Sequence, residues 1–183
     1  DKQESILIPV DLSTVANVVR NASSLEMTGL ELEVMYQVTQ AWNVMATYGY
    51  LDSEYADYLA DLTGDNIVTD NSALVPRNTP KNTFGLTTSY TAKVGNGDLK
   101  ARISYRHRSD METNSSNNPL GTLDSISNVN ATVSYTIDNY GVSLWGRNIT
   151  DQREERWATI GGLTSRGWWN EPATYGVTVS ASF

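Results

Sequence analysis

The side chains best suited to bind a small molecule lie together in one glycine-containing segment near the carboxyl terminus, T-I-G-G-L-T-S-R-G-W-W-N at 159–170. Arg166 carries a guanidinium group that can pair with an anionic ligand. Trp168 and Trp169 carry indole rings that can stack on a flat catecholate, sugar or corrin group. In the alternative interpretation both tryptophans pack loop against loop or belong to an aromatic ring around the fold. We take Arg166, Trp168 and Trp169 as the candidate ligand contacts.

No segment has the pattern of a catalytic or metal site. The chain has 1 His and Cys 0, and a lone histidine lacks the second histidine or cysteine that a transition metal requires. We interpret His107, which stands in R-H-R, as a rim residue. The acidic segment 52–79 lacks the spacing of a calcium loop that ends in a bidentate Glu, so we expect a solvated outer surface there. The sequence predicts no enzyme activity, no metal and no cofactor.

Composition narrows the possible partners. The formal net charge is -8, from 13 Lys+Arg and 21 Asp+Glu, which disfavours nucleic acid as a partner. Tyr 10 and Trp 5 outnumber Phe 2, and tyrosine and tryptophan favour positions with one wet and one apolar end. No apolar run is long enough for a membrane-spanning helix. The first residues do not resemble a signal peptide, so we expect a mature or truncated C-terminal fragment.

The elements that must position these residues are β-strands. In the terminal segment 172–183 the residues of one parity are apolar, and those of the other parity are small and mostly polar. A strand with one apolar face that ends on an aromatic residue is typical of a membrane β-barrel. Similar alternation predicts strands in the other segments, roughly eight in total: 1–9, 22–38, 42–50, 84–94, 99–106, 129–137 and 142–153. Within 142–149, alternation leaves open whether Leu144 or Trp145 points inward.

The links between these segments alternate in length. Tight links near 39–41, 95–98 and 138–141 alternate with long polar ones near 52–79, 109–122 and 154–171. Up-and-down outer-membrane barrels show this asymmetry, whereas a soluble sandwich has no reason to separate its loops by length. With the tight turns at one end, the aromatic residues on the apolar parity form two girdles: Tyr36, Trp42, Tyr90, Tyr135 and Phe183 near the turns, and Tyr50, Phe84, Tyr105 and Tyr175 near the long loops. The sequence predicts an all-β, antiparallel, up-and-down transmembrane β-barrel.

Four short motifs resemble those of TonB-dependent outer-membrane receptors. The segment N-I-T-D at 148–151 is similar to the family's N-L-T-D element, and P-A-T-Y-G at 172–176 with Phe183 is similar to its P-R-T-Y-G ending, with Ala173 in place of the usual Arg. T-G-L-E-L-E at 28–33 resembles the K-G-V-E-L-E strand, and V-P-R-N-T-P-K at 75–81 resembles the P-x-x-T-P-K/R segment. The motifs occur in the family's order along most of the chain.

The resemblance implies a barrel of about twenty-two strands with an N-terminal plug. Residues 1–183 would supply about the last eight strands, while the plug, the earlier strands and the TonB-binding region lie outside this sequence. The implied activity is active uptake of a scarce ligand, commonly a ferric siderophore, in the outer membrane of a Gram-negative cell. The long loops would be extracellular and the C-terminus periplasmic. Tyr175, Val177, Val179 and Phe183 would form the signal that the barrel-assembly machinery reads.

The implied partners are therefore membrane lipid, the plug and remaining strands, the TonB complex, the assembly machinery and a small-molecule ligand. Some charged residues would face inward: Glu31, Glu33, Lys100, Arg102 and Arg106. We expect them to pair with the plug or with neighbouring strands, and a role in the path of the ligand is the alternative. Two alternatives stay open. One is a complete small eight-stranded outer-membrane protein with a structural or adhesive role. The other is a soluble carbohydrate-binding β-protein whose tryptophans form a sugar platform.

Overall fold

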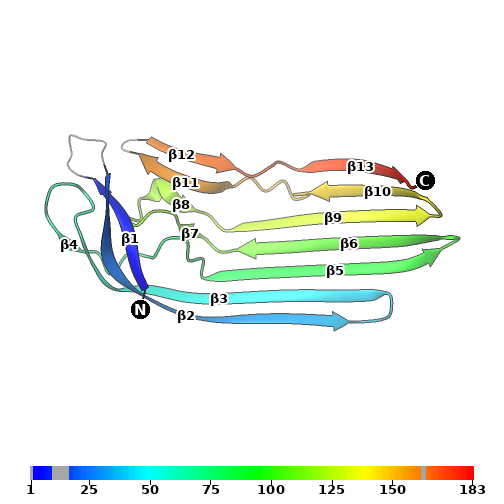
Figure 1. Cartoon of the computed structure of the whole chain (residues 1–183), viewed down its shortest axis with the longest axis horizontal. Coiled ribbons are helices and arrows are strands. Elements are labelled where there is room, and N and C mark those ends of the chain that lie inside the picture. The colour runs from blue at the N-terminus through cyan, green and yellow to red at the C-terminus, as the bar shows by residue number, and fades with distance from the viewer. Residues whose placement is uncertain (1, 10–16, 162–163) are drawn as a thin grey trace.

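Most of the chain folds into one large antiparallel sheet (Figure 1). The computed structural model describes the backbone of residues 2–9, 17–161 and 164–183 and the side chains of residues 24–155 and 167–183. Eight strands pair in the order β1-β2-β3-β5-β6-β9-β10-β13, which confirms the expected all-β antiparallel architecture. The strands are β1 Lys2–Pro9, β2 Asn17–Gln37, β3 Trp42–Ala60, β5 Asn82–Val94, β6 Gly97–Arg108, β9 Ile126–Ile137, β10 Tyr140–Arg147 and β13 Thr174–Ala181.

The remaining elements lie at the end of the sheet that carries the long loops (Figure 1). They are β4 (Thr69–Asp70), which pairs with β3, the β7 (Met111–Glu112) and β8 (Thr122–Leu123) pair, the 3-10 helix η1 (Pro119–Gly121), and the hairpin of β11 (Glu155–Gly161) and β12 (Thr164–Trp169). The short links and the C-terminus lie at the opposite end (Figure 1). The predicted separation of short and long links is therefore confirmed.

All three segments predicted as long loops contain regular structure, including β7, η1 and the start of β8 in 109–122. The segment 154–171 forms the β11–β12 hairpin, and β3 continues to Ala60 into the segment predicted to be poor in strands. Alternation missed this part of β3 because a register shift between Ser24 and Leu25 interrupts its pairing with β2. Around the shift, Tyr55, Tyr58 and Ala60 are buried, so this stretch lacks a single apolar parity.

The strand register separates an apolar face from a polar face. Leu144 lies opposite Val133 and Val177, whereas Trp145 lies opposite Thr132 and Gly176. Leu144 therefore belongs to the apolar face and Trp145 to the polar face, which settles the open choice within 142–149. Large apolar side chains on the apolar face are exposed, among them Leu30, Leu32, Ile103, Leu144, Val177 and Val179. Such a continuous exposed apolar surface is what a sheet facing lipid requires.

Aromatic residues on the apolar face are anchored near both ends of the strands. Near the short links, the Trp42 indole N–H donates a hydrogen bond to Thr88 Oγ1 at 2.7 Å, and the Tyr135 hydroxyl donates to the Val94 carbonyl at 2.9 Å. Near the long loops, the rings of Phe84 and Tyr105 lie 5.9 Å apart. A polar tip with a partner and an apolar ring body suit the membrane–water interface.

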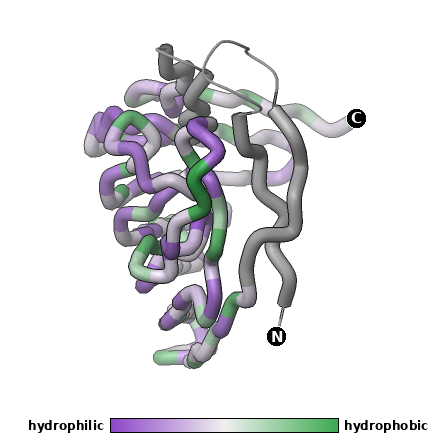
Figure 2. Tube along the Cα trace, turned by 90° about the vertical axis from the view of Figure 1, so that its left-hand side faces the viewer, coloured by the Kyte–Doolittle hydropathy of each residue, from purple (hydrophilic) through white to green (hydrophobic). Residues whose placement is uncertain are grey.

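The buried apolar core of the described side chains lies at the long-loop end. Leu25, Tyr55, Tyr58 and Ala60 form one cluster, against which Leu62 and Leu74 pack. Tyr58 is fully buried, and its hydroxyl donates to the Ser115 carbonyl at 3.1 Å. Figure 2 views the chain from this end, where hydrophilic segments surround short hydrophobic ones. The loops thus have a small core of their own.

Among the described residues, no helix is both long enough and apolar enough to cross a membrane.

Candidate functional site

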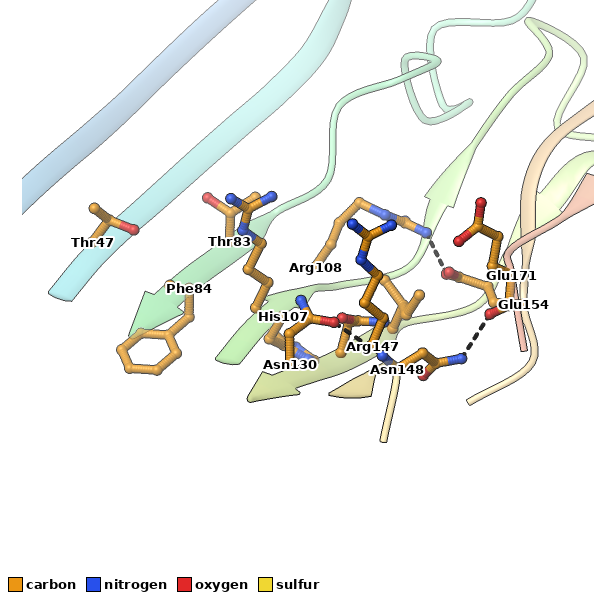
Figure 3. Close-up of a pocket in the computed structure, with 14 residues that line it drawn as sticks. Thr47, Thr83, Phe84, His107, Arg108, Asn130, Arg147, Asn148, Glu154 and Glu171 are labelled. Atoms are coloured by element: carbon orange, nitrogen blue, oxygen red, sulfur yellow. Dashed lines mark hydrogen bonds and ion pairs between the residues drawn. The ribbon is translucent and has the colours of Figure 1, made fainter. Parts of the chain in front are cut away.

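A cavity of about 610 Å³ opens near the long-loop end of the sheet (Figure 3). Its volume lies within the range of small-molecule sites, about 300–1,000 Å³. Strands β3, β5, β6, β9 and β10 and the loop after β10 all contribute to its lining. The lining residues are Thr47, Thr83, Phe84, Gly85, Arg106, His107, Arg108, Ile126, Asn128, Asn130, Arg147, Asn148, Glu154 and Glu171.

Small side chains on β3 and β5 leave room for the long basic side chains of β6. Arg106 lies opposite Gly85 on β5 and opposite Asn128 on β9. A Cβ atom on Gly85 would come within 2.5 Å of Thr47 Oγ1, so a larger residue at this position would require the Thr47 side chain to shift. Strand alternation places Arg106 and Arg108 on the same face, the polar one.

Arg108 is neutralised within the fold. Its guanidinium lies 2.7 Å from Glu154 Oε1, and the side chains are only 20% and 8% exposed. The same guanidinium donates to the carbonyl oxygens of Ser109 and Asp124, at 2.6 and 3.2 Å. Hydrogen bonds of this kind offset the cost of desolvating a buried ion pair. Arg108 therefore fixes the loop after β10 to the end of β6.

Asn148 connects the cavity wall to the terminal strand. The residue is 3% exposed and has a φ of 47°. Its side-chain NH₂ donates to the carbonyl oxygens of Gln152 and Glu171, at 3.0 and 2.9 Å, and its Oδ1 accepts from the Gln152 N–H at 3.1 Å. Asparagine tolerates the left-handed conformation better than most residues. A single side chain thus holds both ends of the loop that contains the β11–β12 hairpin.

The N-I-T-D and P-A-T-Y-G motifs, far apart in the sequence, are in contact. Asp151 Oδ1 accepts a hydrogen bond from the Ala173 N–H at 2.9 Å, and the Tyr175 hydroxyl donates to the Ile149 carbonyl at 3.3 Å. Asp151 also has a positive φ, 47°. The two motifs together fix where β13 begins beside the end of β10.

Arg147 is held by an aromatic ring instead of a carboxylate. Its Cζ lies 5.3 Å from the centre of the Trp145 ring, within the range of a cation–π contact. Trp145 Nε1 donates to Thr178 Oγ1 at 3.2 Å. The ring lies over Gly176, where a Cβ atom would come within 2.2 Å of it. Glycine at this position of P-A-T-Y-G therefore makes room for Trp145.

The sequence-predicted ligand contacts lie on the β11–β12 hairpin, and neither Trp168 nor Trp169 lines the cavity. Trp168 and Trp169 are 71% and 63% exposed. The backbone of Arg166 pairs with that of Thr159, but its side chain lies outside the described part of the chain. Tyr175, Val177 and Val179 are exposed on the apolar face, and Phe183 is exposed beyond β13.

Sequence reasoning placed Arg106 on the inner wall but did not identify the cavity. The signal for Arg106 is its position on the polar parity of its strand. Arg108 and Arg147 could not be identified from the sequence, because their contact partners come from distant segments. His107 lies close to the rim of the sheet, as predicted, with Nδ1 3.0 Å from Ser127 Oγ. Within the described residues, no group of three or more His, Cys, Asp or Glu side chains could hold a metal ion.

Known proteins share this architecture. A family model described as "TonB dependent receptor-like, beta-barrel" matches residues 2–149. The ferric yersiniabactin uptake receptor FyuA from Yersinia pestis is 16% identical with a TM-score of 0.76, over 91% of this chain and 25% of that one. The siderophore receptor PiuA from Acinetobacter baumannii is 22% identical with a TM-score of 0.69, over 96% of this chain and 24% of that one. BauA, the ferric preacinetobactin receptor from Acinetobacter baumannii, is 18% identical with a TM-score of 0.67, over 100% of this chain and 26% of that one.

These structural likenesses support the barrel-type fold, and the chain spans about a quarter of the length of each solved structure. The family model matches far more than half of the residues. This chain therefore belongs to the family of TonB-dependent receptor-like β-barrels.

Proposed function

We propose that this chain is part of an outer-membrane receptor that takes up a scarce ligand, a ferric siderophore, by coupling to TonB. The observation that carries the proposal is the family match over residues 2–149. The three solved structures compared above are described as receptors for siderophores or for a ferric complex, which supports this choice of ligand class. In this proposal the chain contributes to transport and binding and catalyses no reaction.

Residues 1–183 would form the C-terminal part of the barrel, about its last eight strands. The plug, the earlier strands and the TonB-binding region would belong to the rest of the receptor. The quarter-length coverage of each solved structure supports this assignment. The separation of long loops from short links supports an orientation with the long loops outside the cell and the C-terminus in the periplasm of a Gram-negative bacterium.

Arg166, Trp168 and Trp169 would contact the ligand on the extracellular side. The exposure of both tryptophans on a hairpin at the long-loop end supports this role. Each exposed indole can stack on a flat ligand group, a contact of about 0.5–1.5 kcal/mol beyond area burial.

The test uses the full-length receptor in a Gram-negative strain that lacks its own siderophore receptors. Uptake of radioactive iron supplied with a panel of siderophores is compared with and without a functional TonB. We expect energy-dependent uptake of at least one siderophore only when TonB is present. Uptake that persists without TonB, or no uptake of any complex by a correctly inserted receptor, would contradict the proposal.

Two tryptophan variants test the ligand contacts. Trp168→Ala and Trp169→Ala should weaken siderophore binding about fivefold to tenfold. Trp42→Ala is the matched control, because Trp42 lies on the apolar face at the opposite end of the sheet. Equal losses in all three variants would argue against a role of the hairpin in ligand binding.

Tyr175, Val177, Val179 and Phe183 would form the signal for the barrel-assembly machinery. Deletion of Phe183 should lower the amount of receptor at the cell surface more than it lowers ligand affinity. Surface labelling of whole cells measures the first quantity, and binding to the purified receptor measures the second. Normal surface levels of the truncated receptor would exclude this assignment.

A further inference from the structure

We propose that the apolar face of the sheet carries a binding site for one acyl chain of a membrane lipid and for the ester group at the head of that chain. The inference rests on the proposed place of this sheet in a membrane. The acyl chain lies in a groove over β9, β10 and β13. The ester carbonyl accepts a hydrogen bond from a group of polar side chains on β6 and β9. This lipid site is separate from the cavity on the polar face.

The groove has a volume of about 710 Å³, within the range of small-molecule sites, about 300–1,000 Å³. The strand residues of its lining that have the parity of the apolar face are Ala131, Val133, Leu144, Gly146, Tyr175 and Val177. Since side chains alternate between the two faces of a strand, the other strand residues of the lining contribute main-chain atoms. None of the side chains on the groove side carries a charge. The groove therefore suits an uncharged hydrocarbon chain.

Two small residues create the recess. Gly146 and Ala131 lie opposite each other on β10 and β9. Their row continues to Ile103 on β6 and to Tyr175 on β13, and these two large side chains are 51% and 66% exposed. A Cβ atom on Gly146 would come within 2.6 Å of Ile149 Cγ2 and 3.0 Å of Tyr175 Cδ1. The shape of the groove thus depends on the missing side chain at position 146.

The Tyr175 ring is a fixed wall of the groove. Its hydroxyl donates to the Ile149 carbonyl at 3.3 Å, and its ring packs on Gly146, which is buried. A side chain that is already held at its tip and along its ring has little conformational freedom left to lose when a ligand packs against it. This part of the groove is therefore preorganised for binding.

A polar cluster lies on the same face, nearer the long loops. It consists of Tyr105 and His107 on β6 and Ser127 on β9, which share the parity of the apolar face. The Tyr105 hydroxyl lies 3.0 Å from Ser127 Oγ, and His107 Nδ1 lies 3.0 Å from the same oxygen. All three residues are half-buried. Polar side chains on a lipid-facing surface suit the level at which the polar groups of the lipid begin.

The polar cluster has one hydrogen-bond donor more than it uses. Its two hydroxyls and its neutral imidazole carry three O–H or N–H donors. These groups form two hydrogen bonds with one another, and their side chains have no other hydrogen-bond partner among the described residues. In whichever direction the two bonds run, one donor is left for an acceptor outside the chain. A lipid ester carbonyl is such an acceptor, and it brings no donor of its own.

The polar cluster and the groove are spaced as the two ends of one acyl chain require. Ser127 and Ala131 lie on the same face of β9, four residues apart, which is about 13 Å along a strand. The groove extends two residues farther, to Val133. One leaflet supplies half of a hydrocarbon core that is about 30 Å thick. An acyl chain with its ester group at the polar cluster is therefore long enough to lie in the groove.

The experiment measures lipid binding to the purified full-length receptor in detergent by native mass spectrometry. The probes are dipalmitoyl phosphatidylcholine, whose chains are joined by esters, and its dihexadecyl ether analogue, which lacks both ester carbonyls. We expect the wild-type receptor to bind the ester lipid about fivefold more tightly than the ether lipid. Equal affinity for the two lipids would overturn the ester contact, and no binding of either lipid would overturn the whole site.

Ala131→Phe fills the groove and should weaken the binding of both lipids about tenfold. The matched control is Ala46→Phe on β3, because Ala46 lies on the same face between Val34 and Leu86 and does not line the groove. If Ala131→Phe does not insert into the membrane, Ala131→Leu replaces it and should cause a smaller loss. Equal losses at positions 131 and 46, or no loss at either, would show a general lipid layer and overturn the groove.

A combined variant removes every donor of the polar cluster: Tyr105→Phe, His107→Phe and Ser127→Ala. It should abolish the preference for the ester lipid and leave the affinity for the ether lipid unchanged, a pattern that a loss of stability would not produce. Tyr48→Phe is the control, since the Tyr48 hydroxyl lies on the same face and donates to Asn82 Oδ1 at 2.9 Å. A preference that persists in the combined variant would overturn the role of the polar cluster.

The same spectra distinguish a lipid from a second copy of the receptor. A dimeric mass that Ala131→Phe returns to the monomer would assign the groove to contact between two receptors and would overturn the lipid site. Lipid binding in detergent requires neither TonB nor a siderophore. Failure of the transport proposal would therefore appear separately, in the uptake assay, while the lipid affinities stay as expected.

Discussion

The two ends of the sheet are held together by different kinds of bond. At the short-link end, main-chain pairing continues to the last residues of the strands, as between Val94 and Gly97 or between Tyr140 and Ala181. At the long-loop end, side chains bond to the main chain of distant segments, as Asn117 does with Val75. Strand pairing with tight turns is therefore sufficient at one end, whereas the other end depends on particular amide and carboxylate groups.

Backbone conformation shows the same contrast. Every described residue other than glycine with a positive φ is Asn or Asp: Asn66, Asn78, Asn117, Asp138, Asn148 and Asp151. Only Asp138 lies in a short link; the others lie in the long loops. Asn and Asp adopt the left-handed region at a lower cost than other side chains. The long-loop end thus relies on residue types that tolerate unusual backbone angles and also bond to the backbone.

The largest effect is expected from Asn148→Ala. The substitution removes three hydrogen bonds of a buried side chain, and it forces alanine into a backbone conformation with a positive φ. The loss should be about 3 kcal/mol in the free energy of unfolding of the full-length receptor, measured in denaturant. The control is Asn139→Ala in the short β9–β10 link, where we expect less than about 0.5 kcal/mol. Similar losses at both sites would break the comparison between the two ends.

A smaller effect is expected from Asn117→Ala. The Asn117 side chain accepts from the Val75 N–H at 2.6 Å and donates to the Val75 carbonyl at 2.8 Å, which joins the loop before β5 to the loop after β7. Loss of both bonds should cost about 1–2 kcal/mol and speed protease cleavage within the two loops. Ser116→Ala serves as the control because the Ser116 hydroxyl donates to Asn114 Oδ1 and, among the described residues, to nothing else. Unchanged cleavage would show that the small apolar core alone holds the loops.

Exposed ion pairs should matter little at either end. Lys93 Nζ lies 2.8 Å from Asp98 Oδ2 beside a short link, and Lys81 Nζ lies 3.6 Å from Asp52 Oδ1 near the long loops. Replacement of either lysine by alanine should change the free energy of unfolding by at most about 0.5 kcal/mol. A clear loss in only one of the two variants would show that charge, as well as hydrogen bonding, distinguishes the ends.

The most local effect is expected on acidification. Hydrogen bonds from the Ser72 hydroxyl and the Ser72 N–H lower the pKa of Asp70 below its ordinary value of 3.8. A lowered pKa stabilises the folded loop above pH 3.8, and this contribution is lost as the pH falls through the folded pKa. Hydrogen exchange near Ser72 should therefore accelerate below that pH, while exchange in β5 and β6 should not. Asp70→Asn should abolish the pH dependence; its persistence would assign it to another group.

The difference between the two ends also explains what the sequence could predict. Strict alternation in segments such as 84–94 gave the strands and their faces, because one side of each strand meets an apolar environment. Alternation could not place Leu144 and Trp145, since both are large and apolar. Only the neighbours opposite them, Val177 and Gly176, decide the face.

The cavity could not be predicted for a related reason. Its lining runs from Thr47 to Glu171 and depends on the register of five strands and on the path of a loop. Which arginine has an ion-pair partner depends on this loop: Glu154 lies within ion-pair distance of Arg108 but not of Arg106 or Arg147. The β11–β12 hairpin was missed because glycines interrupt its sequence pattern, while the main-chain pairing that forms it does not require alternation.

On β3 and β5, glycine and threonine face each other twice near the cavity: Thr47 lies opposite Gly85, and Gly49 lies opposite Thr83. All four residues have the parity of the polar face, whereas their neighbours Ala46, Tyr48 and Phe84 have the parity of the apolar face. A mutation at one of the four positions therefore alters the inner wall and leaves the lipid-facing surface as it was. Side chains of the inner wall and of the apolar face can therefore change independently of each other at these positions.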